Sequence, residues 1–205
     1  SLEAKPYALD TGRRAVVDHL ARTQPDAQVT MDGDKMRVQF GLPESPPKVS
    51  LIVPTKDAVG LVRNCIDSVL GKTIYPNFEI LLVDNNSSKA ESLAYFDELA
   101  AKDNVSVLRD ARPFNFAAIN NRAVAQCDAE LVCLLNNDVE VIDGNWLSEM
   151  VANLLREDVG AVGARLLYSN NTIQHAGVVL GVGGVAGHAF KCCDRDDFGY
   201  FNRIQ

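Results

Sequence analysis

Three groups of oxygen-bearing side chains come directly after apolar segments, at the positions where buried strands would end. They are Pro54-Thr55-Lys56-Asp57, Asp84-Asn85-Asn86-Ser87 and Asn136-Asn137-Asp138. Each group alone is most simply a turn, because Asp, Asn and Ser side chains bond to local backbone. In an open α/β sheet, however, ligands bind outside the carboxyl ends of the strands. Three such groups on one edge therefore favour a binding site.

The residue types in these groups suit a hard cation and a phosphate-bearing ligand. Oxygen donors without neighbouring His or Cys are typical of Mg²⁺ or Mn²⁺, which take their remaining ligands from water and phosphate oxygens. Asp138 could hold such an ion together with Asn136, which lies on the same side of an extended chain. Asp84 could accept hydrogen bonds from a base or ribose. The expected ligand is a nucleoside diphosphate group, and the ion would neutralise the charge on the departing diphosphate.

The segments that would position these groups alternate between short apolar strands and amphipathic helices. Nearly continuous apolar runs predict strands buried on both faces at 49–53, 78–83, 105–108 and 131–135. Helical patterns are present at 61–70, 88–99, 116–125 and 146–155. Ser88 and Glu91 have the spacing of a capping box for the second helix. The alternation predicts an α/β fold with an open, doubly wound, mainly parallel sheet.

The first part of the chain predicts a helix followed by a hairpin. Asp10 or Thr11 would cap the helix, which runs to about Thr23, and the hairpin strands, at 28–31 and 36–40, flank the turn Asp32-Gly33-Asp34. A proline-rich hinge follows, which places a boundary near Glu44. The predicted organisation is a small N-terminal helix plus hairpin, 1–45, and one larger domain, 46–205.

Four stretches of the larger domain together resemble family 2 glycosyltransferases, which have the GT-A fold. They are Val49 to Asp57, Glu79 to Ser88, the segment around Asn121, and Leu134 to Asp138. A later stretch, Ile173 to Gly181 with Gly187-His188, is similar to the branch of rhamnosyltransferases and O-antigen transferases. The resemblance covers Val49 to about Tyr200.

The resemblance implies roles for individual residues. Thr55 and Asp57 would line the nucleoside pocket, and Asp84 would read the base. Asn121 would brace the diphosphate. The nucleotide-sugar site that it predicts comprises Pro54, Thr55, Asp57, Asp84, Asn86, Asn121 and Asn137. The metal site that it predicts has Asp138 as the last acid of an Asp-x-Asp motif, with Asn136 and His188 as further ligands.

The resemblance also implies an activity. The expected reaction is an inverting transfer of a sugar from a UDP- or dTDP-linked donor to a saccharide or lipid-linked acceptor, with Mg²⁺ or Mn²⁺ as the cofactor. The family's catalytic base is expected beyond Gln205, as in a chain cut from a longer enzyme. Asn136 replaces the first acid of the metal motif. An inert nucleotide-binding module is therefore the alternative.

Three features near the end of the chain leave alternatives open. His175 and His188 could reach the ion or the phosphates. The alternative is a histidine that only bonds to the backbone; this is the simpler interpretation for His175, and for His188 the two interpretations are about equal. The segment 181–186 matches a relaxed dinucleotide fingerprint, but no amphipathic helix follows it, which argues against a nicotinamide-binding enzyme. For Cys192-Cys193, a structural or incidental pair is a simpler interpretation than redox chemistry.

Composition and charge exclude several classes of protein. The 205 residues are 47% apolar and 23% charged, which is typical of a globular chain rather than a disordered one. The net charge is −7, with 20 basic residues among 27 acidic ones, which argues against nucleic-acid binding. No apolar stretch suggests a transmembrane helix. Five cysteines without a C-x-x-C pair, and no leader at the start, predict a location in the cytoplasm or at the inner face of the membrane.

Overall fold

A computed structural model describes residues 7–33, 35–197 and 199. Contacts within the chain group into two compact units, one of residues 43–148 and the other of residues 1–42 with 149–205. The turn residue Asp34 and the expected limit at Tyr200 lie outside the described residues. The domains 1–45 and 46–205 likewise include residues outside the described ranges, and their boundaries stay a prediction.

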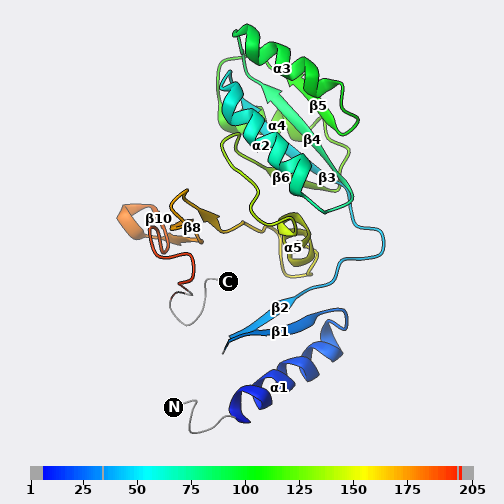
Figure 1. The fold of residues 1–205 in the computed structure, drawn as a ribbon, viewed down its shortest axis with the longest axis vertical. Helices are drawn as coiled ribbons and strands as arrows, with labels where there is room; N and C mark the ends of the chain where they lie inside the picture. Colours follow the sequence, from blue (N-terminus) through cyan, green and yellow to red (C-terminus); the bar gives the residue numbers. More distant parts are fainter. Residues whose placement is uncertain (1–6, 34, 198, 200–205) are drawn as a thin grey trace. The chain divides into compact units, whose positions relative to one another are not determined.

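The unit 43–148 is built on a four-stranded parallel sheet with helices packed on it (Figure 1). Its strands are β3 (Val49–Thr55), β4 (Phe78–Asp84), β5 (Val105–Arg109) and β6 (Leu131–Leu134). Its helices are α2 (Val59–Lys72), α3 (Ala90–Ala100) and α4 (Phe116–Val124). This architecture confirms the predicted open α/β sheet.

The order of the strands is β5-β4-β3-β6, so the chain reverses direction across the sheet after β5. It runs outward from β3 through β4 to β5 and then returns to place β6 on the other side of β3. The register pairs Thr55 with Asp84, and Asp84 with Arg109, so the carboxyl ends of three strands are level. In open α/β sheets, ligands bind at a reversal of this kind, which here lies between β3 and β6.

The core lies between the central strands and the helices. Ile52 of β3 and Val83 of β4 pack with Ile119 and Ala123 of α4, and all four are fully buried. β6 differs from the prediction, because Val132 and Leu134 are 42% and 53% exposed. The predicted burial of both faces is therefore wrong for this strand, whose exposed and partly buried residues alternate.

The other unit begins with the predicted helix and hairpin. Helix α1 (Tyr7–Thr23) lies beside an antiparallel pair, β1 (Gln28–Asp32) and β2 (Lys35–Gln39) (Figure 1). The helix begins earlier than predicted, so Asp10 does not cap it. Asp10 lies in the first turn, where a carboxylate is favoured, and pairs with Arg13 and Arg14.

The Gly-rich end of the chain forms short antiparallel hairpins. Helix α5 (Trp146–Leu154) precedes them, and the division between the units falls within this helix. Strand β7 (Leu166–Leu167) pairs with β8 (Ile173–His175), and β9 (Val178–Leu180) pairs with β10 (Ala186–His188). A 3₁₀ turn, Val182–Gly184, links the last two strands.

Shortening Ile119 tests the packing of α4 on the sheet. We expect Ile119→Ala to lower the free energy of unfolding by about 3 kcal/mol, because it opens a cavity beside Ile52 and Val83. Urea denaturation would measure the change. Val124→Ala is a matched control on the same helix, because Val124 is 40% exposed and should change stability by about 0.5 kcal/mol or less. Equal losses in the two variants would contradict the packing.

Candidate functional site at the carboxyl edge of the sheet

The three polar groups that follow the strands meet at the carboxyl edge of β3, β4 and β6. Asn137 Nδ2 donates to Thr55 Oγ1 at 2.9 Å, which joins the end of β6 to β3 across the reversal of strand order. Asn85 N donates to Thr55 O at 2.8 Å, and Asp57 N donates to Ser87 Oγ at 2.6 Å. The predicted convergence of the three groups is therefore present, with Thr55 in the middle.

Asp57 holds the start of helix α3. Its Oδ1 accepts hydrogen bonds from Ser88 N at 3.0 Å and Lys89 N at 2.9 Å. These bonds, first of all the one from Lys89, keep the pKa of Asp57 below its usual 3.8. The predicted capping box of Ser88 and Glu91 is wrong, because the N-cap is Lys89 and no side chain of the box caps the helix. The carboxylate of Asp57, 31 residues before Ser88, accepts the backbone hydrogen bonds at the start of the helix instead.

The loop that carries Asp57 has an unusual backbone. Asp57 and Ala58 both have a φ of 51°, in the left-handed region that residues other than glycine rarely adopt. Ala58 is also the N-cap of α2. The bonds of Asp57 to the segment after β4 hold this conformation in place, which is typical of a loop whose shape matters for a site.

Asp84 is buried, with both carboxylate oxygens occupied by partners from the chain. Oδ1 accepts from Ser87 N at 2.9 Å, and Oδ2 accepts from Arg109 Nη1 at 2.8 Å. Its side chain is 3% exposed. Arg109 also contacts Asp97 at 3.1 Å. The carboxylate is thus rigidly oriented beside Thr55, and each oxygen keeps a second lone pair for another donor.

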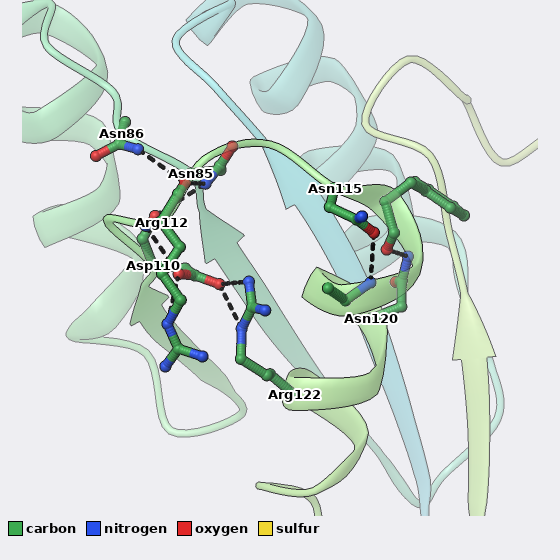
Figure 2. Close-up of polar contacts among 9 residues, drawn as sticks. Asn85, Asn86, Asp110, Arg112, Asn115, Asn120 and Arg122 are labelled. Atoms are coloured by element: carbon green, nitrogen blue, oxygen red, sulfur yellow. Dashed lines mark hydrogen bonds and ion pairs between the residues drawn. The ribbon is translucent and has the colours of Figure 1, made fainter.

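Asn85 and Asn86 tie the end of β4 to the loop after β5 (Figure 2). Asn85 Nδ2 donates to Asp110 O at 2.9 Å and to Arg112 O at 2.8 Å. Asn86 Nδ2 donates to Arg112 O at 3.1 Å. Asn86 has a φ of 63°, which asparagine tolerates better than most residues. The amide of this predicted binding residue is therefore engaged within the chain.

Asp110 is the buried centre of this network (Figure 2). Its carboxylate accepts from Arg122 Nε at 2.8 Å and from Arg112 N at 3.1 Å. The hydrogen bond from Arg122 is the main reason that the pKa of Asp110 lies below 3.8. Asp110 N also donates to Asp84 O at 2.8 Å. The ion pair fixes α4, which carries Arg122, to the ends of β4 and β5.

Helix α4 carries Asn121, and no hydrogen bond among the described residues joins its side chain to the three groups. Asn115 Oδ1 caps the helix by accepting from Ala118 N at 2.9 Å. Asn121 is exposed on the helix, whereas Asn120 is buried and donates to Phe116 O at 2.8 Å (Figure 2). Within the described part of the chain, Asn120 Oδ1 has no hydrogen-bond partner.

The two residues of the predicted metal motif lie at the end of β6. Asp138 and Asn136 are both exposed, and Asn136 O accepts from Cys65 Sγ at 3.5 Å. Among the described residues, none forms a hydrogen bond or ion pair with the Asp138 carboxylate, which leaves its oxygens open to a ligand. No group of three or more His, Cys, Asp or Glu side chains that could hold a metal ion is found in residues 7–33, 35–197 and 199.

His188 lies in the unit of residues 1–42 and 149–205, whereas Asp138 lies in the unit 43–148. His188 contacts His175 within its own unit. Its predicted participation in the Asp138 metal site stays a prediction.

The model of the family described as "Glycosyl transferase family 2" matches residues 50–178. The chain belongs to glycosyl transferase family 2. The matched range includes all three polar groups and the Asp110 network.

Relatives of this family 2 chain are much longer than the chain. It is 48% identical over its whole length to the uncharacterized protein y4gI of Sinorhizobium fredii, of which it covers 23%. It is 46% identical, over 89% of its residues, to the O-antigen biosynthesis protein RfbC of Myxococcus xanthus, of which it covers 14%. It is 31% identical, over 58% of its residues, to the O-antigen chain rhamnosyltransferase RfbN of Salmonella typhimurium, of which it covers 37%.

The fold of the chain is that of a solved glycosyltransferase. The mannosyltransferase PcManGT from Pyrobaculum calidifontis matches 83% of the chain with a TM-score of 0.55, at 20% identity and over 49% of that protein. The predicted GT-A type of fold is therefore confirmed. None of the helices in the described ranges has the length and apolar character needed to cross a membrane.

Three residues that organise this edge of the family 2 chain, Arg109, Asp110 and Arg122, are not among the predicted site residues. The signal for two of them was available. Arg109 and Asp110 follow the apolar run 105–108, so inspecting the end of every predicted strand would have included them. Arg122 carries no such signal, because its pairing with Asp110 depends on how α4 packs.

Removing the Asp57 carboxylate should weaken the attachment of α3. We expect Asp57→Ala to lower stability toward urea at neutral pH, because two backbone N–H groups lose their acceptor. Since the folded-state pKa of Asp57 lies below 3.8, its contribution is complete above about pH 5 and disappears as the pH falls below about 4. The difference between wild type and variant should therefore narrow on acidification.

Asp103→Ala serves as the control for this experiment. Asp103 is exposed just beyond α3 and forms no hydrogen bond or ion pair with any residue that the structure describes. Its removal should leave the stability unchanged at every pH. A loss of stability in Asp57→Ala that does not change with pH would contradict the role of the Asp57 carboxylate at the start of α3.

Proposed function

We propose that this chain binds the donor of a glycosyltransferase, a UDP- or dTDP-linked sugar, at the carboxyl edge of β3, β4 and β6. The observation that carries the proposal is the bond between Asn137 and Thr55, which brings the exposed Asp138 and the buried Asp84 to one edge at the reversal of strand order. In this arrangement the open carboxylate of Asp138 would face the diphosphate of the donor, and the oriented carboxylate of Asp84 would face the nucleoside.

The individual roles follow from how each side chain is held. Asp84 has lone pairs available beyond its bonds to Ser87 and Arg109, and these would accept a donor from the base. Thr55 and Asp57 would line the nucleoside pocket, with Pro54, Asn86 and Asn137 shaping its walls. Asn121, exposed on α4, would contact the diphosphate.

A divalent cation fits the donor set at the end of β6. Asp138 offers a carboxylate without a partner in the described chain, and Asn136 offers an amide oxygen, so Mg²⁺ or Mn²⁺ would complete its shell with phosphate oxygens and water. When bound, the ion would neutralise charge on the diphosphate leaving group. PcManGT was solved with GDP-Man and Mn²⁺, which makes Mn²⁺ the first ion to test.

We propose that the complete enzyme transfers the sugar with inversion to a saccharide or lipid-linked acceptor. The acceptor oxygen would bond to the anomeric carbon as the bond to the diphosphate breaks, and the hydroxyl proton would pass to a base. We assign no residue of this chain as that base. The names of RfbC and RfbN favour an acceptor of the O-antigen type and a rhamnosyl donor. The reaction would take place in the cytoplasm or at the inner face of the membrane.

A nucleotide-binding module without turnover is the second candidate, favoured by Asn136 in place of the first acid of the metal motif. Hydrolysis or transfer of a donor sugar by this chain would exclude it.

Asp138→Asn tests the metal assignment. We expect Mn²⁺ to strengthen UDP binding to the wild type, measured by calorimetry, and to have little effect on the variant, because the principal carboxylate ligand is lost. Thermal stability should not change, since the Asp138 side chain is exposed. Asp103→Asn is the control for the loss of one surface charge. An unchanged Mn²⁺ effect in Asp138→Asn would refute the assignment.

Asp84→Asn tests the nucleoside pocket without metal. We expect roughly tenfold weaker uridine or thymidine binding in EDTA, because the substitution replaces a charged carboxylate acceptor with a neutral amide of nearly the same shape. Asp97→Asn is the matched control, because Asp97 is the other carboxylate that pairs with Arg109 and is 77% exposed. Equal weakening in both variants would mean that Arg109, rather than Asp84, determines the affinity.

A further inference from the structure

The two histidines near the end of the chain face each other at the base of two hairpins. His175 ends β8, and His188 ends β10. Their Nδ1 atoms are 2.9 Å apart, with the ring planes at 80° to one another. They are two of the three histidines in the sequence.

Backbone hydrogen bonds hold both histidines in position. Ala189 N donates to Gly177 O at 3.0 Å, which closes the base of the β9–β10 hairpin beside His188. On the other side, Ile173 is fully buried and exchanges backbone bonds with Cys192 and Cys193, which anchors β8 before His175. The short distance between the rings therefore results from two anchored segments.

In the structure this distance is that of a hydrogen bond between the two rings, and it also matches the distance between two nitrogen ligands of one metal ion. With metal–nitrogen bonds of about 2.0–2.1 Å, two imidazole nitrogens lie about 2.9 Å apart at a right angle and about 3.3 Å apart in a tetrahedron. A small rotation of each ring would direct both Nδ1 lone pairs at a common ion, with the protons of the neutral rings on Nε2. No hydrogen bond or ion pair in the described part of the chain links either ring to a carboxylate.

We propose that His175 and His188 form a two-imidazole site for a borderline transition-metal ion, with Zn²⁺ as the expected occupant. Imidazole nitrogen selects Zn²⁺, Ni²⁺ and Cu²⁺ over Mg²⁺ and Mn²⁺, so this site differs chemically from the oxygen site at Asp138. The remaining coordination positions are open to water, because His188 is exposed and His175 is half-buried.

Such an ion would cross-link the two hairpins. The segment between the histidines contains four glycines with positive φ, at 177, 181, 183 and 184, which makes its backbone conformationally costly to order. Joining its two ends through one ion would shorten the free loop and stabilise the β9–β10 hairpin. The bound ion would thus act by cross-linking the two hairpins, and it would be separate from nucleotide binding.

The test is a calorimetric titration of the chain with ZnCl₂, which measures the affinity and the number of ions bound. We expect one Zn²⁺ per chain, and we expect either His175→Gln or His188→Gln to weaken it by roughly tenfold or more, as loss of metal-site residues commonly does. His19→Gln is the matched control, because His19 is exposed on α1. Cys192→Ser/Cys193→Ser controls for thiolate binding, and Asp138→Asn controls for the oxygen site. None of these three should alter Zn²⁺ affinity.

A second measurement identifies the ligating atoms. In chain labelled with ¹⁵N-histidine, Zn²⁺ should shift the Nδ1 resonances of two histidines and leave the third unchanged. Unaltered Zn²⁺ affinity in both His175→Gln and His188→Gln would overturn the proposal, and so would ligation through Nε2. Loss of Zn²⁺ binding in the cysteine variant or in Asp138→Asn would assign the ion elsewhere.

Discussion

The hydrogen bond between Asn137 and Thr55 joins two strands that are far apart in sequence but adjacent in the sheet. It lies where the strand order reverses, so the chain must complete β4 and β5 before β6 can bring Asn137 to this place. The open carboxylate of Asp138 follows directly after Asn137. The position of Asp138, the proposed metal ligand, relative to Thr55 and Asp84 therefore depends on the pairing of β3 with β6.

The carboxylates at this edge divide into anchored and open groups. Asp57, Asp84 and Asp110 accept backbone N–H or guanidinium donors, and the pKa values of Asp57 and Asp110 are lowered by those bonds. Their charges are compensated within the chain, and their geometry is fixed. Asp138 has no such bond in the described structure, so its charge is available to a cation. This division would let an acidic edge bind a diphosphate in the proposed function, because only the uncompensated carboxylate would need a metal ion.

The two proposed metal sites differ in the atoms that they offer. The edge of the sheet presents carboxylate and amide oxygens, which suit a hard ion that also coordinates phosphate. The His175–His188 pair presents two imidazole nitrogens on backbone that is held at both ends, which suits a borderline ion and a structural role. Ligand type would thus separate the ion proposed to bind with the donor from the ion proposed to cross-link the two hairpins.

The sequence by itself determined most elements of the unit 43–148 and the edge on which the polar groups lie. Hydrophobic period and strand-ending residues are local signals, and they predicted β3, β4, α2 and the meeting of the three groups, while the family motifs predicted the GT-A type of fold. Tertiary structure decided how each side chain is used. Asp57 caps α3 from 31 residues away, Asp110 pairs with Arg122 of α4, and the histidines meet across two hairpins. These contacts join residues that share no local pattern, because they depend on packing and strand order, which act between segments distant along the chain.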